Sequence, residues 1–131
     1  MKLQGKVAIV TGGGRDIGAA IAVKLASEGA AVMINYFASS KGAEDTVAQI
    51  EAAGGKALAL QGDLNNQDDV DALVTKTVEA FGGVHILVNN AGGLIARKKI
   101  AEMELSHWEA VMTLNLTSTF MMTKACLAHM T

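Results

Sequence analysis

The sequence contains no proline, one cysteine and one tyrosine, and only 4% of its 131 residues are aromatic. The single cysteine, Cys126, excludes an internal disulfide and suits a reducing compartment, so we interpret it as a buried structural residue. No apolar run approaches the roughly 20 residues that a membrane span needs. The segment from Met1 to Gly5 shows no secretory signal. These absences favour a cytoplasmic protein without a membrane partner.

Charge of either sign is also scarce, since charged residues make up 18% of the chain and the formal net charge is −2. Without a basic field, nucleic acid and anionic lipid are not expected partners. The histidines (His85, His107 and His129) are scattered without metal-ligand spacing, so we expect no metal site. Half of the residues are apolar, and the length fits one domain over residues 1–131.

Short, largely apolar runs alternate with helical patterns along the chain. The runs are typical of strands buried on both faces of a parallel sheet, and they span Val7–Val10, Ala31–Ile34, Ala57–Leu60 and His85–Val88. Helical stripes beginning at Ile17, Ala43 and Val70 separate them, each closed by glycine. This order predicts a doubly wound parallel α/β sheet, represented here by its first four strands and their helices.

A final helix is predicted to begin at Ser106, because Glu109 follows at the spacing of a capping box. The pattern continues this helix toward the end of the chain. In a doubly wound sheet it would also cover a further strand, which these residues do not contain. Ile86 and Val88 would then lie on an open strand edge. We therefore expect residues 1–131 to aggregate or fold loosely when expressed alone.

The first predicted strand runs directly into the sequence TGGGRDIG. Its three consecutive glycines, Gly12 to Gly14, allow a tight turn and a close approach to a pyrophosphate. The helix that begins near Asp16 directs free N–H groups toward such an anion. This placement between a strand and a helix predicts a dinucleotide site, with a purely structural turn as the alternative.

Polar and small residues also follow the third and fourth predicted strands. Asp63, in the triplet GDL, offers a carboxylate that can accept from an adenine amino group, or else serves as a loop acid before the next helix. The sequence NNAGG begins at Asn89, and its small residues admit a ligand while its amides tie neighbouring loops together. A plain turn is the alternative for this segment.

These motifs, together with Asn115 in TLNLTS, resemble the short-chain dehydrogenase/reductase family in order and spacing. The segment NYFASSK looks most like the branch of bacterial 3-oxoacyl-carrier-protein reductases. The resemblance implies a Rossmann-like NAD(P)-binding domain of an oxidoreductase that interconverts a small-molecule carbonyl and an alcohol, as a homotetramer or homodimer.

The resemblance also assigns roles to residues. It implies cofactor contacts by the matching positions of the three motifs, which are Gly12, Gly14, Arg15, Asp16, Ile17, Gly18, Asp63, Leu64, Asn89, Asn90, Ala91 and Gly92. The asparagine matching Asn115 helps to position a water in a proton relay. A polar residue at a local helix kink is the alternative for Asn115, and the two are compatible.

Asp16 departs from the family pattern, which has glycine at this position. We interpret Asp16 as the N-cap of the helix, since aspartate oxygens accept from free N–H groups there. Gly12 and Gly18 still leave room for a ligand, and Arg15 offsets the negative charge. We expect aspartate at this position to change the affinity for the cofactor, but not to abolish cofactor binding.

The residues at the end of the second predicted strand indicate which cofactor is preferred. NAD is usually selected by an acid about 20 residues after the glycine turn, but here NYF is followed by no carboxylate before Glu44. Tyr36 and Ser39 are therefore included among the cofactor contacts, and NADP(H) is predicted over NAD(H). The candidates to bind a 2′-phosphate are Arg15, Ser39, Ser40 and Lys41, the last three having solvated surface roles as the alternative.

The family's proton donor is a tyrosine with a lysine four residues later, and a serine upstream. The only tyrosine is Tyr36, and Ser40 stands where the lysine would be. We expect the catalytic serine, tyrosine and lysine to lie beyond Thr131. The alternative is a non-catalytic dinucleotide-binding module that acts as a sensor or scaffold. A methyltransferase fits less well, because it normally needs an acid where Tyr36 stands.

Overall fold

The structure, a computed structural model, describes residues 1–93 and 95–130. Its strands form one parallel sheet in the order β3-β2-β1-β4. The bounds are Val7–Val10 for β1, Ala31–Tyr36 for β2, Lys56–Gln61 for β3 and Ile86–Val88 for β4. Because β4 returns to the opposite side of β1 from β2, strand order reverses beside β1. The predicted doubly wound sheet is confirmed.

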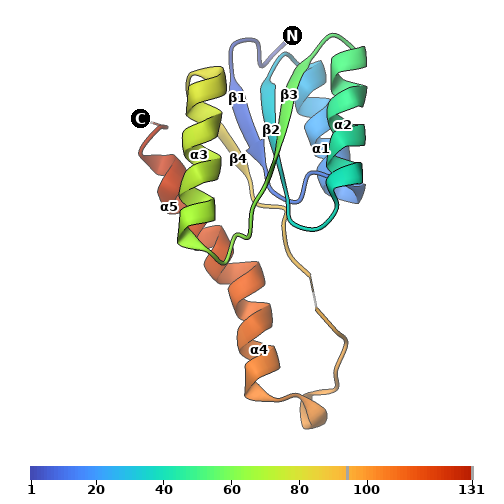
Figure 1. Cartoon of the computed structure of the whole chain (residues 1–131), viewed down its shortest axis with the longest axis vertical. Coiled ribbons are helices and arrows are strands. Elements are labelled where there is room, and N and C mark those ends of the chain that lie inside the picture. Colours follow the sequence, from blue (N-terminus) through green and yellow to red (C-terminus); the bar gives the residue numbers. More distant parts are fainter. Residues whose placement is uncertain (94, 131) are drawn as a thin grey trace.

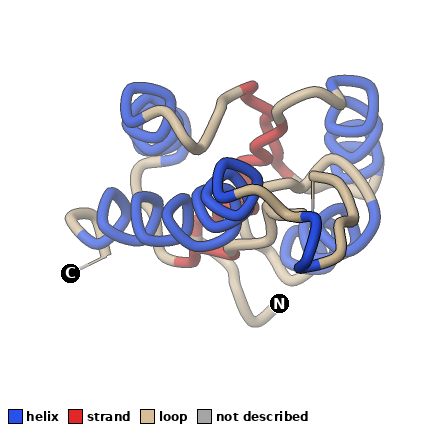
Figure 2. The backbone as a smooth tube through the Cα atoms, turned by 90° about the horizontal axis from the view of Figure 1, so that it is seen from below, coloured by secondary structure: helices blue, strands red, loops and turns tan. Residues whose placement is uncertain are grey.

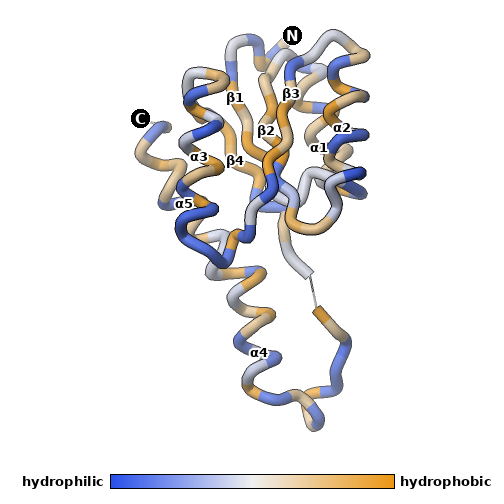
Figure 3. The backbone as a smooth tube through the Cα atoms, in the orientation of Figure 1, coloured by the Kyte–Doolittle hydropathy of each residue, from blue (hydrophilic) through white to orange (hydrophobic). Residues whose placement is uncertain are grey.

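Helices cover both faces of the sheet (Figures 1 and 2). On one face α1 (Asp16–Ser27) packs beside α2 (Ser40–Ala52), and on the other α3 (Gln67–Phe81) packs beside α5 (Ser118–Leu127). The two faces bury separate apolar clusters, in which neighbouring residues of β1 take opposite sides: Ile9 joins α3 and α5, and Val10 joins α1 and α2. Burial on both sides explains the unbroken apolar runs of β1 and β2 (Figure 3). The expectation of burial on both faces is wrong for β3, where Leu58 is 44% exposed.

The carboxyl ends of the helices follow the predicted glycine signals. Gly82 ends α3 in the left-handed conformation, with φ of 91°, and its N–H donates to the Val78 carbonyl at 2.8 Å. At the other end of α3, the Asn66 side chain accepts from the Asp69 N–H at 3.1 Å. Both ends therefore satisfy backbone groups that a bare helix would leave unpaired.

The predicted capping box at Ser106 is wrong. The helix α4 (Leu105–Met112) begins one residue earlier, with Glu104 at the N-cap and no side-chain capping bond. The expected continuation of the helix toward the end of the chain is confirmed, because helical backbone runs to Leu127, with a π-helical segment (Thr113–Thr117) between α4 and α5. Sequence spacing identified a helix here, which a short 3-10 turn (Ile100–Glu102) precedes.

The segment after β4 leaves the carboxyl edge of the sheet and extends away from it together with α4 (Figure 1). No residue of α4 is buried, and Leu105 and Trp108 are 69% and 53% exposed. Across the described ranges, none of the helices has both the length and the apolarity to cross a bilayer. The strand β4 pairs with β1, on one side, within these ranges, and the expected aggregation of residues 1–131 stays a prediction.

Candidate functional site

A cleft of about 510 Å³ opens at the carboxyl ends of the strands. This is where doubly wound sheets bind ligands, beside the point at which strand order reverses. Predicted cofactor residues that line it are Gly12, Arg15, Asp16, Ile17, Asp63, Leu64, Asn90, Ala91 and Gly92. The sequence interpretation missed further lining residues, which are Asn35, Phe37, Gly62, Asn65 and Leu114.

Close packing gives the glycine turn its shape. Gly12 has φ of 62°, and a Cβ there would lie 3.1 Å from the Asn90 amide nitrogen. A Cβ on Gly18 would overlap the Gly12 carbonyl oxygen, so α1 can approach the turn only if residue 18 is glycine. Gly14 lies against the backbone of Ala43 in α2. Gly14 and Gly18 therefore support the cleft from behind, outside the set of residues that line it.

The first turn of α1 faces the cleft through Arg15, Asp16 and Ile17. Arg15 is the N-cap, with extended backbone (φ −163°) and no side-chain capping bond. The N–H groups of a helix's first turn have no intrahelical acceptor, and they carry the positive end of the helix dipole. Together with a glycine turn that excludes side chains, this donor set fits a pyrophosphate.

The prediction that Asp16 caps α1 is wrong. Asp16 is the first residue of the helix rather than its N-cap, and its φ is 53°. That left-handed conformation favours glycine and is tolerated by aspartate better than by most residues. The departure from the family's glycine is thus a backbone cost as well as an added charge beside the cleft.

The loop after β4 is tied to the glycine turn, as its asparagines suggested. The Asn90 side-chain amide donates to the Gly12 carbonyl at 3.0 Å. The Thr11 hydroxyl accepts from the Asn90 and Ala91 N–H groups, both at 3.0 Å, a role that the sequence interpretation missed. Asn89 instead reaches α5, where its amide donates to the Thr123 hydroxyl at 3.4 Å. The prediction that amides join neighbouring loops is confirmed for Asn90.

Asp63 lies in the cleft and also organises its own loop. Its Oδ1 accepts from the Asn65 N–H at 2.9 Å, and its N–H donates to Asp69 Oδ2 at 2.9 Å. Such a turn is what the alternative interpretation of Asp63 expects. The same bonds hold the carboxylate at the cleft wall beside Leu64, so the structural role and a role in adenine recognition are compatible.

Asn115 lies in the π-helical segment, at the boundary between α4 and α5. Its Oδ1 accepts from the Gly93 N–H at 2.9 Å, while its Nδ2 donates to the carbonyls of Gly93 at 2.7 Å and Val111 at 2.8 Å. The side chain therefore joins the irregular helix to the loop after β4. This is the kink role, and the proton-relay role stays a prediction.

The end of β2 presents no carboxylate to the cleft. Asn35 and the 65% exposed Phe37 line it, whereas Tyr36 and Ser39 lie outside the lining. Arg15 is exposed and lines the cleft. Lys41 pairs with Asp45 one turn along α2, with 3.1 Å between Nζ and Oδ2. Of the candidates for a 2′-phosphate, Arg15 is therefore the best placed.

Other titratable residues have structural surroundings. Cys126 is fully buried, and burial raises the pKa of its thiol to about 11, which opposes a nucleophilic role. The Nδ1 atom of His85 accepts from the Val7 N–H at 2.9 Å. In the part of the chain that the structure describes, no group of three or more His, Cys, Asp or Glu residues is arranged to hold a metal ion.

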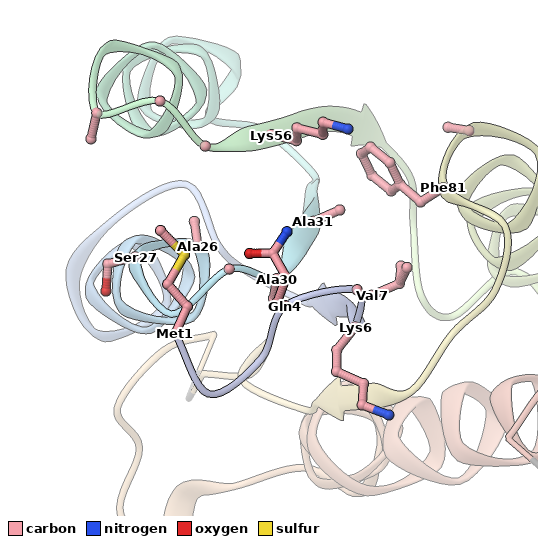
Figure 4. A pocket seen from close by; sticks show the side chains of 16 residues that line it. Met1, Gln4, Lys6, Val7, Ala26, Ser27, Ala30, Ala31, Lys56 and Phe81 are labelled. Atoms are coloured by element: carbon pink, nitrogen blue, oxygen red, sulfur yellow. The ribbon is translucent and has the colours of Figure 1, made fainter.

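A second cavity, of about 390 Å³, lies at the amino ends of the strands (Figure 4). Lys6, Lys56 and Phe81 lie around it, with Ala26 and Ser27 from the last turn of α1. Helices end rather than begin at this edge, so they present carbonyl groups and the negative ends of their dipoles. This edge therefore offers lysine side chains but not the free helix N–H groups that make the carboxyl edge suitable for a pyrophosphate.

The chain is similar to known proteins in both sequence and structure. The short chain dehydrogenase family matches residues 6–131. The chain is 45% identical over 123 residues to the 3-oxoacyl-[acyl-carrier-protein] reductase of Synechocystis, covering 94% of this chain and 49% of that protein. It is 38% identical over 128 residues to glucose 1-dehydrogenase 2 of Bacillus subtilis, covering 98% and 50%.

Among solved structures, a short chain dehydrogenase from Burkholderia cenocepacia in complex with NADP is 42% identical, with a TM-score of 0.94. The match covers 99% of this chain and 53% of that one. The chain thus spans about half the length of the relatives it matches. On the family match and the conservation of fold at this identity, the chain belongs to the short chain dehydrogenase family.

Proposed function

We propose that this chain binds NADP(H) in the carboxyl-edge cleft and forms the cofactor-binding part of an oxidoreductase. The reaction would interconvert a carbonyl and an alcohol. The observation that carries the proposal is the convergence on one cleft of a glycine turn, the open first turn of α1, Asp63 and the loop from Asn90 to Gly92.

Each part of the cleft has a binding task. The first turn of α1 would hold the pyrophosphate, and the Asp63 carboxylate would accept from the adenine amino group. Small residues at Ala91 and Gly92 leave space beside the backbone for the nicotinamide ribose. The bound cofactor would supply or accept the hydride. The Asn115 side chain holds the loop at Gly93 in place next to this end of the cleft.

The preference for NADP(H) rests on charge at the end of β2. A carboxylate there would repel a 2′-phosphate, and the cleft has none at that point. The exposed Arg15 guanidinium offers the planar donor set that phosphate recognition favours. The Burkholderia relative in complex with NADP supports this choice.

The proposal extends to the class of substrate and to the location of the proton donor. A 3-oxoacyl thioester is the substrate class favoured by the Synechocystis relative. Tyr36, the only tyrosine, lies at the end of β2 and outside the cleft lining, so we place the proton donor in a segment beyond these residues. We also propose that the full-length protein is a homotetramer or homodimer and lies in the cytoplasm.

Titration of the full-length protein with NADPH and NADH, followed by an assay of NADPH oxidation with a 3-oxoacyl thioester, tests the proposal. Tighter binding of NADPH together with turnover is the expected result. Equal affinities would contradict the cofactor preference. Binding without turnover of any carbonyl substrate would favour the non-catalytic binding module, and absence of dinucleotide binding would refute the proposed function.

A further inference from the structure

Asn35 is a polar side chain buried at the end of β2, with only 2% of its surface exposed. Among the buried polar residues that the structure describes, Thr46 and Thr77 are hydroxyls that bond within their own helix, as Thr77 bonds to the Leu73 carbonyl at 2.7 Å. Asn35 differs because its partners come from two other segments. Its position is therefore not explained by local helix or strand geometry.

The Asn35 side chain uses both ends of its amide. Its Oδ1 accepts from the Gly12 N–H at 3.4 Å, and its Nδ2 donates to the Gly62 carbonyl at 3.2 Å. The Asn35 backbone carbonyl also accepts from the Gly13 N–H at 3.1 Å. One residue of β2 thus bonds to the turn that follows β1 and to the turn that follows β3.

These two turns carry different parts of the proposed dinucleotide site. Gly12 begins the pyrophosphate turn, and Gly62 precedes Asp63, the proposed adenine acceptor. Gly12 is also held from its other side, because its carbonyl accepts from Asn90 at 3.0 Å. The peptide groups flanking Gly12 are therefore held by an amide from β2 and an amide from the loop after β4. Of these two amides, that of Asn35 also bonds to the Gly62 turn, which is held in addition by the bond from the Gly62 N–H to the Tyr36 carbonyl at 2.9 Å.

We propose that Asn35 is a positioning residue for the cofactor, which sets the spacing between the pyrophosphate turn and the Gly62–Asp63 turn before the ligand arrives. The inference rests on the proposed dinucleotide function. A compact side chain with one acceptor and one donor is needed, since the Gly12 N–H must be accepted and the Gly62 carbonyl must receive a donor. Pre-ordering of both turns lowers the cost of binding.

Asn35 bonds to backbone groups on both sides, so its effect does not depend on the 2′-phosphate. In the full-length protein, Asn35→Leu is expected to raise the Kd of NADPH and of NADH by the same factor, about tenfold or more. The ratio of the two constants stays unchanged. Asn35→Ala provides a second variant if the leucine variant does not fold. Thr77→Val is the matched control, because it removes a buried hydroxyl bond away from the cleft and should leave both constants unchanged.

Amide hydrogen exchange of the ligand-free protein supplies a measurement that needs no cofactor. The Asn35 variants should speed exchange at Gly12, Gly13 and Gly62, and Thr77→Val should not. Folded Asn35 variants with wild-type Kd values and wild-type exchange at these glycines would overturn the inference. If the wild-type protein binds no dinucleotide, the proposed function fails, and faster exchange at both turns in the variants would still support the coupling by Asn35.

Discussion

The two edges of the sheet are built from the same strands and helices, yet they differ in how their loops are held. At the carboxyl edge, side chains of Thr11, Asn35 and Asn90 bond to backbone groups of other loops. At the amino edge, α1 and α2 end in backbone bonds close in sequence, followed by Gly29 and Gly54 with positive φ. Bonds between distant segments also occur at the amino edge, where the Leu3 N–H donates to the Glu28 carbonyl at 2.7 Å and the Val7 N–H donates to His85 Nδ1 at 2.9 Å. What distinguishes the carboxyl edge is that the amides of Asn35 and Asn90 converge on one residue, Gly12.

This difference matters for binding because the carboxyl edge also receives the beginnings of the helices. Free N–H groups and positive dipole ends meet there, in loops whose geometry is already fixed. The cavity at the amino edge has comparable room, at about 390 Å³ against about 510 Å³, but it faces helix carbonyl ends. Cavity size therefore does not distinguish the two edges. The free N–H groups at helix beginnings and the convergence of Asn35 and Asn90 on the glycine turn do.

The largest expected effect comes from adding one methyl group at each edge. In Gly18→Ala the new Cβ would overlap the Gly12 carbonyl oxygen, which should lower stability by about 1–3 kcal/mol and weaken cofactor binding at least tenfold. Gly54→Ala is the matched control, because its Cβ meets no heavy atom within 4 Å although φ is 89°. It should cost about 1–2 kcal/mol in stability and leave the Kd unchanged. Thermal unfolding and NADPH titration measure both quantities, and wild-type affinity in Gly18→Ala would contradict the account.

Removal of a cation from each edge tests the basis of cofactor selection. Arg15→Ala should narrow the difference in binding free energy between NADPH and NADH by about 1–3 kcal/mol, the value of a hydrogen bond to a charged group. Lys56→Ala, at the amino edge, is the control and should leave the difference unchanged. Titration calorimetry with both cofactors decides the point. An unchanged difference in Arg15→Ala would move 2′-phosphate recognition to other residues.

Asp16 allows backbone strain and charge to be separated within the carboxyl edge. Asp16→Gly relieves a φ of 53° and should raise stability by up to about 1 kcal/mol, while also tightening NADPH binding by removal of a negative charge. Asp16→Asn removes the charge and keeps a side chain that tolerates the left-handed region. It should tighten binding without the gain in stability. Weaker cofactor binding in both variants would show that the carboxylate assists the ligand.

The smallest effect is expected at Ser106, in the extension beyond the carboxyl edge. Ser106 makes no capping bond to α4, so Ser106→Ala should change the free energy of unfolding by less than about 0.5 kcal/mol, the range of an ordinary surface substitution. Asn66→Ala, which removes the observed cap of α3, is the positive control and should cost about 1 kcal/mol. Urea unfolding distinguishes the two. A loss at Ser106 as large as at Asn66 would restore the capping box.

The parts of the fold that were predicted correctly depend on local patterns. The run Val7–Val10 is apolar because both faces of β1 are covered, and Gly82 ends α3 because a left-handed residue is needed there. The position of the cleft followed from the order of strands and helices. Each of these signals is contained within a few residues of sequence.

The parts that sequence reasoning missed depend on contacts between distant segments. In the sequence, Asn35 was noted only because no acid stands at the end of the second strand. Its bonds to Gly12 and Gly62 depend on the sheet, which places β2 between β1 and β3. Asp16 has a positive φ next to the point where α1 closely approaches the glycine turn, a tertiary arrangement that aspartate's capping preference does not reveal. Tertiary contacts overrode local propensity at both positions.

Amide NMR of the full-length protein during NADPH titration tests the contrast between the edges most directly. We expect saturable shifts of the amide signals at the carboxyl edge, from Gly12 to Gly18, at Gly62 to Leu64 and at Asn90 to Gly92. Amides at the amino edge, including Gly29, Gly54 and Gly82, should keep their positions. Saturable shifts concentrated at the amino edge, with the glycine turn unchanged, would contradict this expectation.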